Sequence, residues 1–178
     1  TGAAISEISA ELDLSSVANL LGSMPSVLDA FVPEHYDMAG ELAAEWYEEL
    51  REASNVTQPY SPSIRGKGAT DWISREVERY AEQLHGNLDD EIAKIMAESE
   101  ALLQKEVARG FRDTIIGNSE DDKKAIGFSR VARPGACPMC RMLAGKGAVY
   151  RTAESARFAA HGNCHCLARP SFDDGTHG

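Results

Sequence analysis

The sequence predicts an α+β protein that is mainly helical, in which a helical N-terminal region is followed by a small β-rich module stapled by zinc. Apolar residues recur at helical spacing through most of residues 1–127. All four cysteines lie between Cys137 and Cys166. The segment around them has the glycines and short apolar runs that are typical of turns and hairpins. We therefore expect two domains, a helical domain at 1–127 and a Cys/His metal-binding module at 128–178.

The front of the helical domain is expected to be a series of helices separated by prolines. Residues 1–22 alternate small, acidic and aliphatic residues at an approximate helical spacing. Because proline is tolerated in the first turn of a helix but not deeper, Pro25 and Pro33 predict a break and a restart each. From Pro33 to Ser54 the helical pattern is strong, with one aromatic and one acidic face.

Two more helices are expected after a connector. Residues 55–69 carry two prolines and two glycines among polar residues, a composition typical of loops. Thr70 is a candidate N-cap for a helix that ends before Gly86, and Asn87 for a longer helix at 88–111. Joined by a short turn, these two helices should pack as an antiparallel hairpin. Six large side chains are expected to be mostly buried: Trp46, Trp72, Tyr80, Ile92, Ile95 and Leu103.

A short helix at 119–126 is expected to end the helical domain, and a strand at 128–131 is expected to begin the module. Residues 142–150 have the pattern of a hairpin that turns on glycines. Residues 167–172 then return as an extended edge, which Pro170 should end. A knuckle, a hairpin and a returning pair of ligands predict an architecture like a zinc ribbon or a treble clef.

The candidate metal ligands fall into two clusters. Cys137 and Cys140 form a Cys-x-x-Cys knuckle, and His161, Cys164 and Cys166 form a His-x-x-Cys-x-Cys run. A structural zinc ion takes four tetrahedral ligands from Cys and His, so the two clusters offer more than enough. The first choice is Cys137, Cys140, His161 and Cys164, with Cys166 as a replacement for either of the last two. Four protein ligands leave no open position for a catalytic water, so the predicted site is structural.

Two other interpretations of the cysteines remain open. Four cysteines allow two disulfides, and Cys137 with Cys140 alone has the spacing of a thioredoxin-like redox pair. A redox pair normally opens a helix after a strand in a βαβ pattern, which the sequence does not show. Disulfide frameworks belong to secreted proteins, and no signal-peptide pattern is visible. Zinc is therefore the preferred interpretation.

The net charge of −10 is unevenly distributed. Residues 1–60 hold eleven Asp or Glu and one Arg, whereas residues 129–178 hold seven Lys or Arg and three Asp or Glu. Because nucleic-acid affinity depends mostly on Lys and Arg contacts with phosphates, the acidic front is not expected to bind nucleic acid. Only the module, at +4, is a candidate for contacting DNA, and it lacks a basic helix. No apolar run approaches the ~18 residues needed to cross a bilayer, so no membrane partner is expected.

The sequence contains no recognisable catalytic motif, so we expect a protein that is not an enzyme. There is no Ser-His-Asp arrangement, P-loop or Gly-x-Gly-x-x-Gly. A zinc deaminase needs a Glu two residues after a His, and none of the five histidines has one. Asp173, Asp174 and His177 are the only residues that suggest a nuclease, and we interpret them as part of a surface tail.

Several motifs carry a family resemblance. In the module they are Arg130-Val131, Pro134–Cys140, Met142–Tyr150 and His161–Cys166, and looser matches lie at Trp46–Arg51 and Arg109–Ile115. With these motifs the chain resembles the MuF-like minor capsid, or head morphogenesis, proteins of tailed bacteriophages, particularly those of actinobacterial phages. Many members have Arg where this chain has His165, which adds a further candidate nitrogen ligand.

The resemblance implies a minor structural protein of a tailed-phage head that acts in head assembly or is packaged with the genome. It implies synthesis in the cytoplasm of the bacterial host and a final place in the virion, inside the procapsid or near the portal. The expected partners are the portal protein, the major capsid protein or both, with no small-molecule substrate. The alternative is a zinc-dependent enzyme or a DNA-binding module that acts on packaged DNA.

Overall fold

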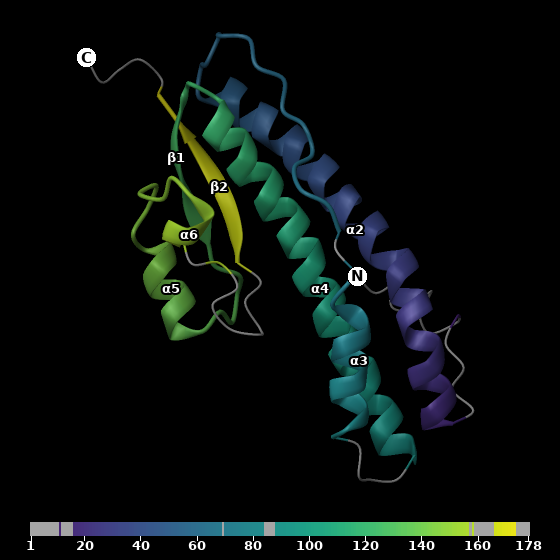
Figure 1. Ribbon diagram of the computed structural model, residues 1–178. Coiled ribbons are helices and arrows are strands. Elements are labelled where there is room, and N and C mark those ends of the chain that lie inside the picture. The colour runs from purple at the N-terminus through teal and green to yellow at the C-terminus, as the bar shows by residue number, and fades with distance from the viewer. Residues whose placement is uncertain are drawn as a thin grey trace. The chain divides into compact units, whose positions relative to one another are not determined.

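The computed structural model describes residues 11, 16–68, 70–83, 88–156, 158 and 166–173. Its elements in chain order (Figure 1) are α2 (Val17–Ala53), α3 (Ile73–Ala81), α4 (Leu88–Asp121), β1 (Ala125–Val131), α5 (Pro138–Ala144), α6 (Ala153–Ala156) and β2 (Leu167–Phe172). The described part is thus mainly helical, with one two-stranded antiparallel sheet, which confirms the predicted combination in this coarse form. Among the described helices, none is long and apolar enough to cross a membrane.

The chain divides into two compact units. The first unit combines Thr1–His35 with Gly68–Glu106, and the second unit combines Tyr36–Lys67 with Val107–Gly178. α2 and α4 each contribute to both units, whereas both strands, α5 and α6 belong to the second. The predicted boundary at residue 127 concerns which parts fold on their own, and it remains a prediction.

In the first unit, α2 buries one narrow apolar face. Leu20, Met24, Leu28 and Val32 are four residues apart and at most 1% exposed. Residues at this spacing lie on one side of a helix, so they form a continuous stripe. Ser99 on α4 reaches this stripe, because its hydroxyl oxygen lies 3.7 Å from the Met24 sulfur.

α3 and the start of α4 are antiparallel neighbours, as predicted. A small cavity is lined by Tyr80 and Gln83 on one side and by Ile95 and Glu98 on the other. The Lys94 ammonium donates to the Gln83 carbonyl oxygen at 3.5 Å. Residues further back from the turn in α3 thus lie beside residues further along α4, as in an antiparallel helical hairpin.

The second unit has its own core, in which α2, α4, both strands and α6 meet. Its buried members are Ala43, Tyr47, Ile115, Ile116, Phe128, Tyr150, Ala156 and Ala168. Rings from different elements contact one another there: Tyr47 meets Phe172 edge to face at 5.2 Å between centroids. The sheet is therefore anchored to the helices by aromatic side chains.

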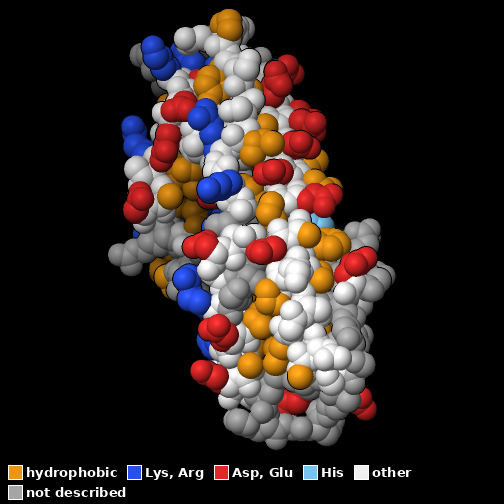
Figure 2. Space-filling view, turned by 45° about the vertical axis from the view of Figure 1, so that its right-hand side comes forward, with side chains coloured by type: hydrophobic (Ala, Val, Ile, Leu, Met, Phe, Trp, Pro, Cys, Tyr) orange, Lys and Arg blue, Asp and Glu red, His pale blue; other side chains and the backbone are white. Residues whose placement is uncertain are grey.

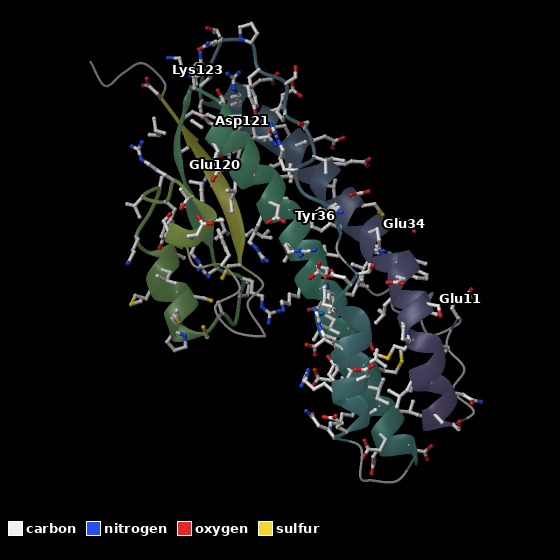
Figure 3. All side chains as sticks on the ribbon, viewed as in Figure 1. Glu11, Glu34, Tyr36, Glu120, Asp121 and Lys123 are labelled. Carbon is white, nitrogen blue, oxygen red and sulfur yellow. The ribbon has the colours of Figure 1, made fainter. Side chains whose placement is uncertain are left out.

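α2 and α4 approach closely at Gly110. A Cβ atom at this position would collide with the carbonyl oxygen of Tyr36. The Tyr36 side chain lies on the α4 side of α2 (Figure 3), where its hydroxyl donates to the Asp113 carboxylate at 2.7 Å. The absence of a side chain at Gly110 is therefore what allows this close packing within the second unit.

The sheet explains why Pro170 lies inside β2 instead of ending it. Phe128 faces Pro170 across the ladder and also forms a bridge with Tyr150 on its other side. The Phe128 N–H donates to the Tyr150 carbonyl at 2.8 Å, and the Tyr150 N–H donates back at 3.2 Å. The N–H and C=O of Phe128 therefore both point away from β2. Pro170, which faces Phe128 in β2, needs no N–H at this position, so the proline removes no hydrogen bond between the strands.

The predicted helix breaks at Pro25 and Pro33 are wrong, because α2 continues through both prolines for 37 residues. A proline inside a helix costs about 3 kcal/mol. Buried side chains of α2 continue past both prolines, with Met24 and Leu28 on either side of Pro25 and Val32 and Tyr36 on either side of Pro33. Each large side chain that is buried contributes about 1.5–3 kcal/mol. Burial along an uninterrupted face therefore outweighs the two lost hydrogen bonds.

The predicted helix end at 111 and the separate helix predicted at 119–126 are also wrong, since α4 continues to Asp121 and β1 begins at Ala125. Asn118 and Ser119 look like turn and cap residues in the sequence. In the structure both donate from their side chains to the carbonyl four residues earlier, at 2.7 Å each. Such back-bonding satisfies the polar side chains inside the helix, so they do not end it.

The predicted hairpin at 142–150 does not form, and the module is therefore less rich in strands than expected. Pro138 lies at the start of α5, where its fixed φ and missing N–H suit a first helical turn. The glycine-rich turn follows at Gly145 to Gly147, and Gly147 has the positive φ of 72°. Only the predicted strands at 128–131 and 167–172 are confirmed, as parts of β1 and β2.

Half of the predicted core residues are fully buried. Tyr80, Ile95 and Leu103 are at most 5% exposed. Trp46, Trp72 and Ile92 are only half-buried. Trp72 precedes the first turn of α3 as its N-cap, a position that was predicted for Thr70.

Candidate metal centre

The knuckle Cys137–Cys140 forms the start of α5. Cys137 is the N-cap, with an extended backbone at φ −62° and ψ 159°. Its sulfur accepts the Cys140 backbone N–H at 3.3 Å. Residues three apart lie on the same side of a helical turn, and hydrogen bonds to sulfur are among the outer contacts that orient metal-bound thiolates. The fold thus places these two sulfur atoms on one side of the turn.

Cys166 reaches the same place from the other end of the module. It lies just before β2 and forms a cluster with Cys140. Cys166 is 1% exposed and Cys140 is 3% exposed. Cys137, Ala132, Ala136 and Phe158 pack against this pair. Of the cysteines that the structure describes, all are thiols rather than halves of disulfides. We call this group of three cysteines the cysteine cluster.

The remaining predicted ligands, His161 and Cys164, and the neighbouring His165 lie outside the described residues. Within the described ranges, no group of three or more His, Cys, Asp or Glu side chains is placed to hold a metal ion. The fold therefore brings three of the five candidates into one cluster without showing a metal geometry. The donor chemistry fits zinc, which takes thiolates and imidazoles.

Two buried arginines flank the cysteine cluster. Arg130 on β1 is 2% exposed, and its guanidinium donates to the Cys140 sulfur at 3.6 Å and to the Ala156 carbonyl. Arg112 on α4 is 3% exposed and donates to the Cys166 carbonyl at 3.1 Å. Both guanidinium groups lie over the Phe158 ring, 5.4 Å (Arg112) and 4.7 Å (Arg130) from its centroid.

These arginines give the cluster a distinct electrostatic character. A buried cation is costly unless anionic or polar acceptors compensate it. A metal-bound thiolate accepts a charge-assisted hydrogen bond, which is stronger than one to a neutral thiol. Arg130 is therefore suited to support a thiolate at Cys140, and Arg112 fixes the backbone that carries Cys166.

Sequence reasoning gave Arg112, Arg130 and Phe158 no role at the site, although both arginines lie in motifs that carry the family resemblance. A signal existed for Arg130, because it follows Phe128 at the two-residue spacing of one strand face, and Phe128 is an obvious core residue. Its partner in the ladder is the small Ala168, which leaves room for a long side chain. For Arg112 and Phe158 no comparable pattern exists in the sequence.

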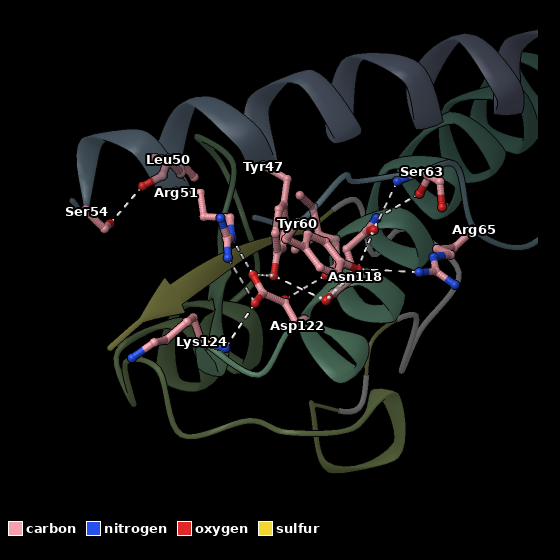
Figure 4. Close-up of polar contacts among 12 residues, drawn as sticks. Tyr47, Leu50, Arg51, Ser54, Tyr60, Ser63, Arg65, Asn118, Asp122 and Lys124 are labelled. Atoms are coloured by element: carbon pink, nitrogen blue, oxygen red, sulfur yellow. Dashed lines mark hydrogen bonds and ion pairs between the residues drawn. The ribbon is translucent and has the colours of Figure 1, made fainter. Parts of the chain in front are cut away.

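A second buried polar group lies at the end of α4, and we call it the Asp122 clamp (Figure 4). The Asp122 carboxylate accepts from the Arg51 Nε at 2.6 Å, and their side chains are 3% and 7% exposed. The Tyr47 hydroxyl donates to the same carboxylate at 3.3 Å, and the Lys124 N–H at 3.0 Å. Burial first, and then the Asp122 charge, raise the pKa of Tyr47 above its ordinary value, so it remains a donor.

Asn118 extends the clamp to the loop after α2. Its side chain accepts from the Ser63 N–H at 3.1 Å and donates to the Ser63 carbonyl at 2.8 Å. The Tyr60 hydroxyl donates to it at 2.9 Å. Since these polar atoms are buried or half-buried and have partners within the chain, the clamp holds the loop in place.

Comparison with known protein families identifies the family of this chain. The family model described as VG15 protein matches residues 2–178. The chain belongs to the VG15 protein family. This is a phage virion-gene family, so the VG15 chain is a phage protein. The comparison with curated proteins and the comparison with solved structures each found no match.

Proposed function

We propose that this VG15 family member is a minor structural protein of the phage head, of the MuF-like kind, which associates with the portal or the major capsid protein. A zinc ion held by Cys137, Cys140, Cys166 and either His161 or Cys164 stabilises its C-terminal part. It acts in head assembly or is packaged with the genome, and it has no catalytic role. The observation that carries the proposal is the cysteine cluster inside a phage-family chain.

The sequence separation of the cysteines supports a metal. Cys140 and Cys166 belong to segments 26 residues apart, and the described apolar residues around them are small, apart from Phe158. So small an apolar cluster contributes little hydrophobic stabilisation. A metal ion bound by residues from both segments supplies the missing free energy, as in small zinc-dependent modules.

Burial supports a structural rather than a catalytic metal. Cys140 and Cys166 are almost fully buried, whereas a catalytic zinc needs an open coordination position that substrate can reach. The zinc-dependent enzyme of the alternative interpretation would need such an opening. The buried arginines and Phe158 occupy the space beside the cysteines.

The second unit offers an acidic surface for a head partner. Asp37, Glu41, Glu45, Glu48, Glu49 and Glu52 are all exposed on α2. Figure 2 shows acidic side chains recurring along the upper right-hand side of the molecule, with hydrophobic ones among them. The one arginine of this stretch, Arg51, is buried against Asp122. A partner with exposed Lys and Arg therefore meets a negative electrostatic potential along this surface.

The test first locates the chain in the phage particle and then measures its capture by the portal and major capsid proteins. Quantitative mass spectrometry of purified heads, with imaging of a tagged copy, should find the chain at the portal or inside the shell. Co-expressed portal or major capsid protein should capture the wild-type chain, and capture should weaken as salt shortens the screening length to about 3 Å at 1 M. The variant Glu48→Gln with Glu52→Gln should bind less.

Two results would contradict the proposal. One is absence of the chain from purified particles that contain the other head proteins. The other is binding of the chain to duplex DNA with a steep salt dependence and no capture by either head protein, which would support the DNA-binding alternative.

A further inference from the structure

The second unit has an open groove with apolar walls, lined on one side by α2 and on the other by the sheet. Its volume is about 720 Å³. Its apolar lining comes from Leu42 and Trp46 of α2, from Phe111 of α4, and from Val131 and Leu167 of the sheet. Trp46 and Phe111 are in ring contact, with centroids 5.6 Å apart.

This groove leaves large apolar side chains in contact with water. Leu42 is 61% exposed and Val131 is 39% exposed. A cavity of this size matches the range of about 300–1,000 Å³ typical of binding sites. Exposed apolar surface of this kind, rimmed by polar residues, usually marks an interaction site.

The rim of the groove is acidic on the α2 side. Glu45 and Glu49 line it, and both are exposed. Among the described residues that line it, the exposed Arg169 of β2 is the one cation. An occupant that fits should therefore present apolar side chains together with several Lys or Arg.

The same chain carries a surface with these properties on α5 and the turn after it. Met139, Met142 and Val149 are 39%, 61% and 61% exposed. Met139 and Met142 are three residues apart and lie on one side of α5, next to the side that carries the buried Cys140 and Leu143. We call Met139, Met142 and Val149 with the cations around them the α5 surface.

The charge of the α5 surface is complementary to that of the groove. Arg133, Arg141, Lys146 and Arg151 are all exposed, and residues 132–153 contain no Asp or Glu. Methionine side chains are flexible and adapt to irregular apolar surfaces, so they suit a groove formed by several elements. The two exposed apolar surfaces of the second unit thus match in both polarity and charge.

We propose that the groove of one copy receives the α5 surface of a second copy of this chain. Because the two surfaces differ, the contact is head-to-tail, and it builds a ring or a growing chain rather than a closed two-fold dimer. The proposal goes beyond the proposed function and does not depend on it, since it concerns the purified protein alone. Its failure would leave association with a head partner untouched.

The test uses the full chain in sedimentation velocity over a wide range of concentration. The wild type should associate further as concentration rises, and less in high salt because complementary charges are screened. Leu42→Lys should block the groove, and Met142→Ser combined with Val149→Ser should weaken the α5 surface. Both variants should sediment as monomers. All three residues are highly exposed, so circular dichroism should show unchanged helix content.

A mixture of the two variants gives the sharpest result. Each variant keeps one intact surface, so the mixture should form dimers of one copy of each and nothing larger. Ile126→Lys serves as the matched control, because Ile126 is 46% exposed and belongs to neither surface. It should associate like the wild type.

Three outcomes would overturn the proposal. A wild type that stays monomeric at every concentration would contradict it directly. Self-association that both variants retain would show that another surface mediates it. A monomeric wild type that binds duplex DNA and loses this binding on Arg141→Gln would assign the α5 surface to nucleic acid.

Discussion

The Asp122 clamp and the cysteine cluster are both buried polar groups of the second unit, yet they are stabilised in different ways. In the clamp, one carboxylate receives the Arg51 guanidinium, the Tyr47 hydroxyl and a backbone N–H. In the cysteine cluster, sulfur atoms meet an arginine, a backbone N–H and small apolar residues. The charges of the clamp are balanced within the chain, whereas we propose that a metal ion balances the thiolates of the cysteine cluster.

This difference separates two sources of stability. The clamp joins α2, the following loop and the end of α4, and it depends only on residues that fold together. The cysteine cluster joins α5 to the start of β2, and we infer that it depends on an ion from solution. Changes in the clamp should therefore destabilise the protein under all conditions, whereas changes in the cluster should act through metal binding.

Loss of the metal should have the largest effect. Cys140→Ser, or a chelator added to the wild type, should remove zinc binding, whose apparent free energy in small modules is about 10–16 kcal/mol. Hydrogen exchange measured by mass spectrometry should show loss of protection in α5 and β2, while α2 in the first unit stays protected. Equal protection of α5 with and without chelator would show that the cluster needs no metal.

Removing the carboxylate of the clamp should rank second. Asp122→Asn leaves the Arg51 charge buried without its anionic partner, which costs about 3–5 kcal/mol. Urea unfolding should show this loss whether or not zinc is present. The matched control is Asp121→Asn, because Asp121 is paired with Arg65 but is 56% exposed, and exposed pairs contribute about 0–1 kcal/mol. Equal effects of both changes would contradict the clamp.

The arginine beside the cysteines should affect metal affinity by a smaller amount. Arg130→Met removes the hydrogen bond to the Cys140 sulfur, and loss of such outer contacts typically weakens metal binding about 10–100-fold. Competition with a zinc-binding dye measures this directly. Arg133→Met, at an exposed position, should bind zinc like the wild type. A lower unfolding temperature of the zinc-saturated protein with unchanged affinity would make Arg130 a packing residue only.

The Tyr47 hydroxyl should have the smallest effect. Tyr47→Phe removes one buried hydrogen bond, worth about 1 kcal/mol near neutral pH. Because the folded state raises the Tyr47 pKa above its ordinary value of 10.0, unfolded chains lose this proton first as the pH rises. Stability is therefore complete below pH 10 and falls above it, and the variant should show a shallower fall. An identical pH profile would contradict this role.

Sequence reasoning worked where one local pattern decides the structure. The apolar periodicity of residues 88–111 predicted α4 there, and the alternation around Phe128 predicted β1. It failed where tertiary contacts override a local rule. Pro25 lies inside α2 because the buried stripe continues on both sides, and Asn118 lies inside α4 because its side chain has acceptors at Thr114 and Ser63.

The candidate site shows the same division. The spacing of the cysteines was sufficient to predict that Cys137 and Cys140 share one side of a turn, and the cluster also includes Cys166, which was only a replacement in the first choice of ligands. The arginines could not be predicted, because burial of Arg112 depends on an acceptor at Cys166, 54 residues away. Spacing in sequence carries no information about such a contact.

Native mass spectrometry of the protein purified without added metal tests the central claim most directly. It reports the number of bound zinc ions and the oxidation state of the four cysteines in a single measurement. Our account predicts a mass increase that corresponds to one zinc ion per chain, which disappears when the protein is denatured in acid. A metal-free chain whose mass is four hydrogens too low would show that the cysteines form two disulfides, and would contradict the account.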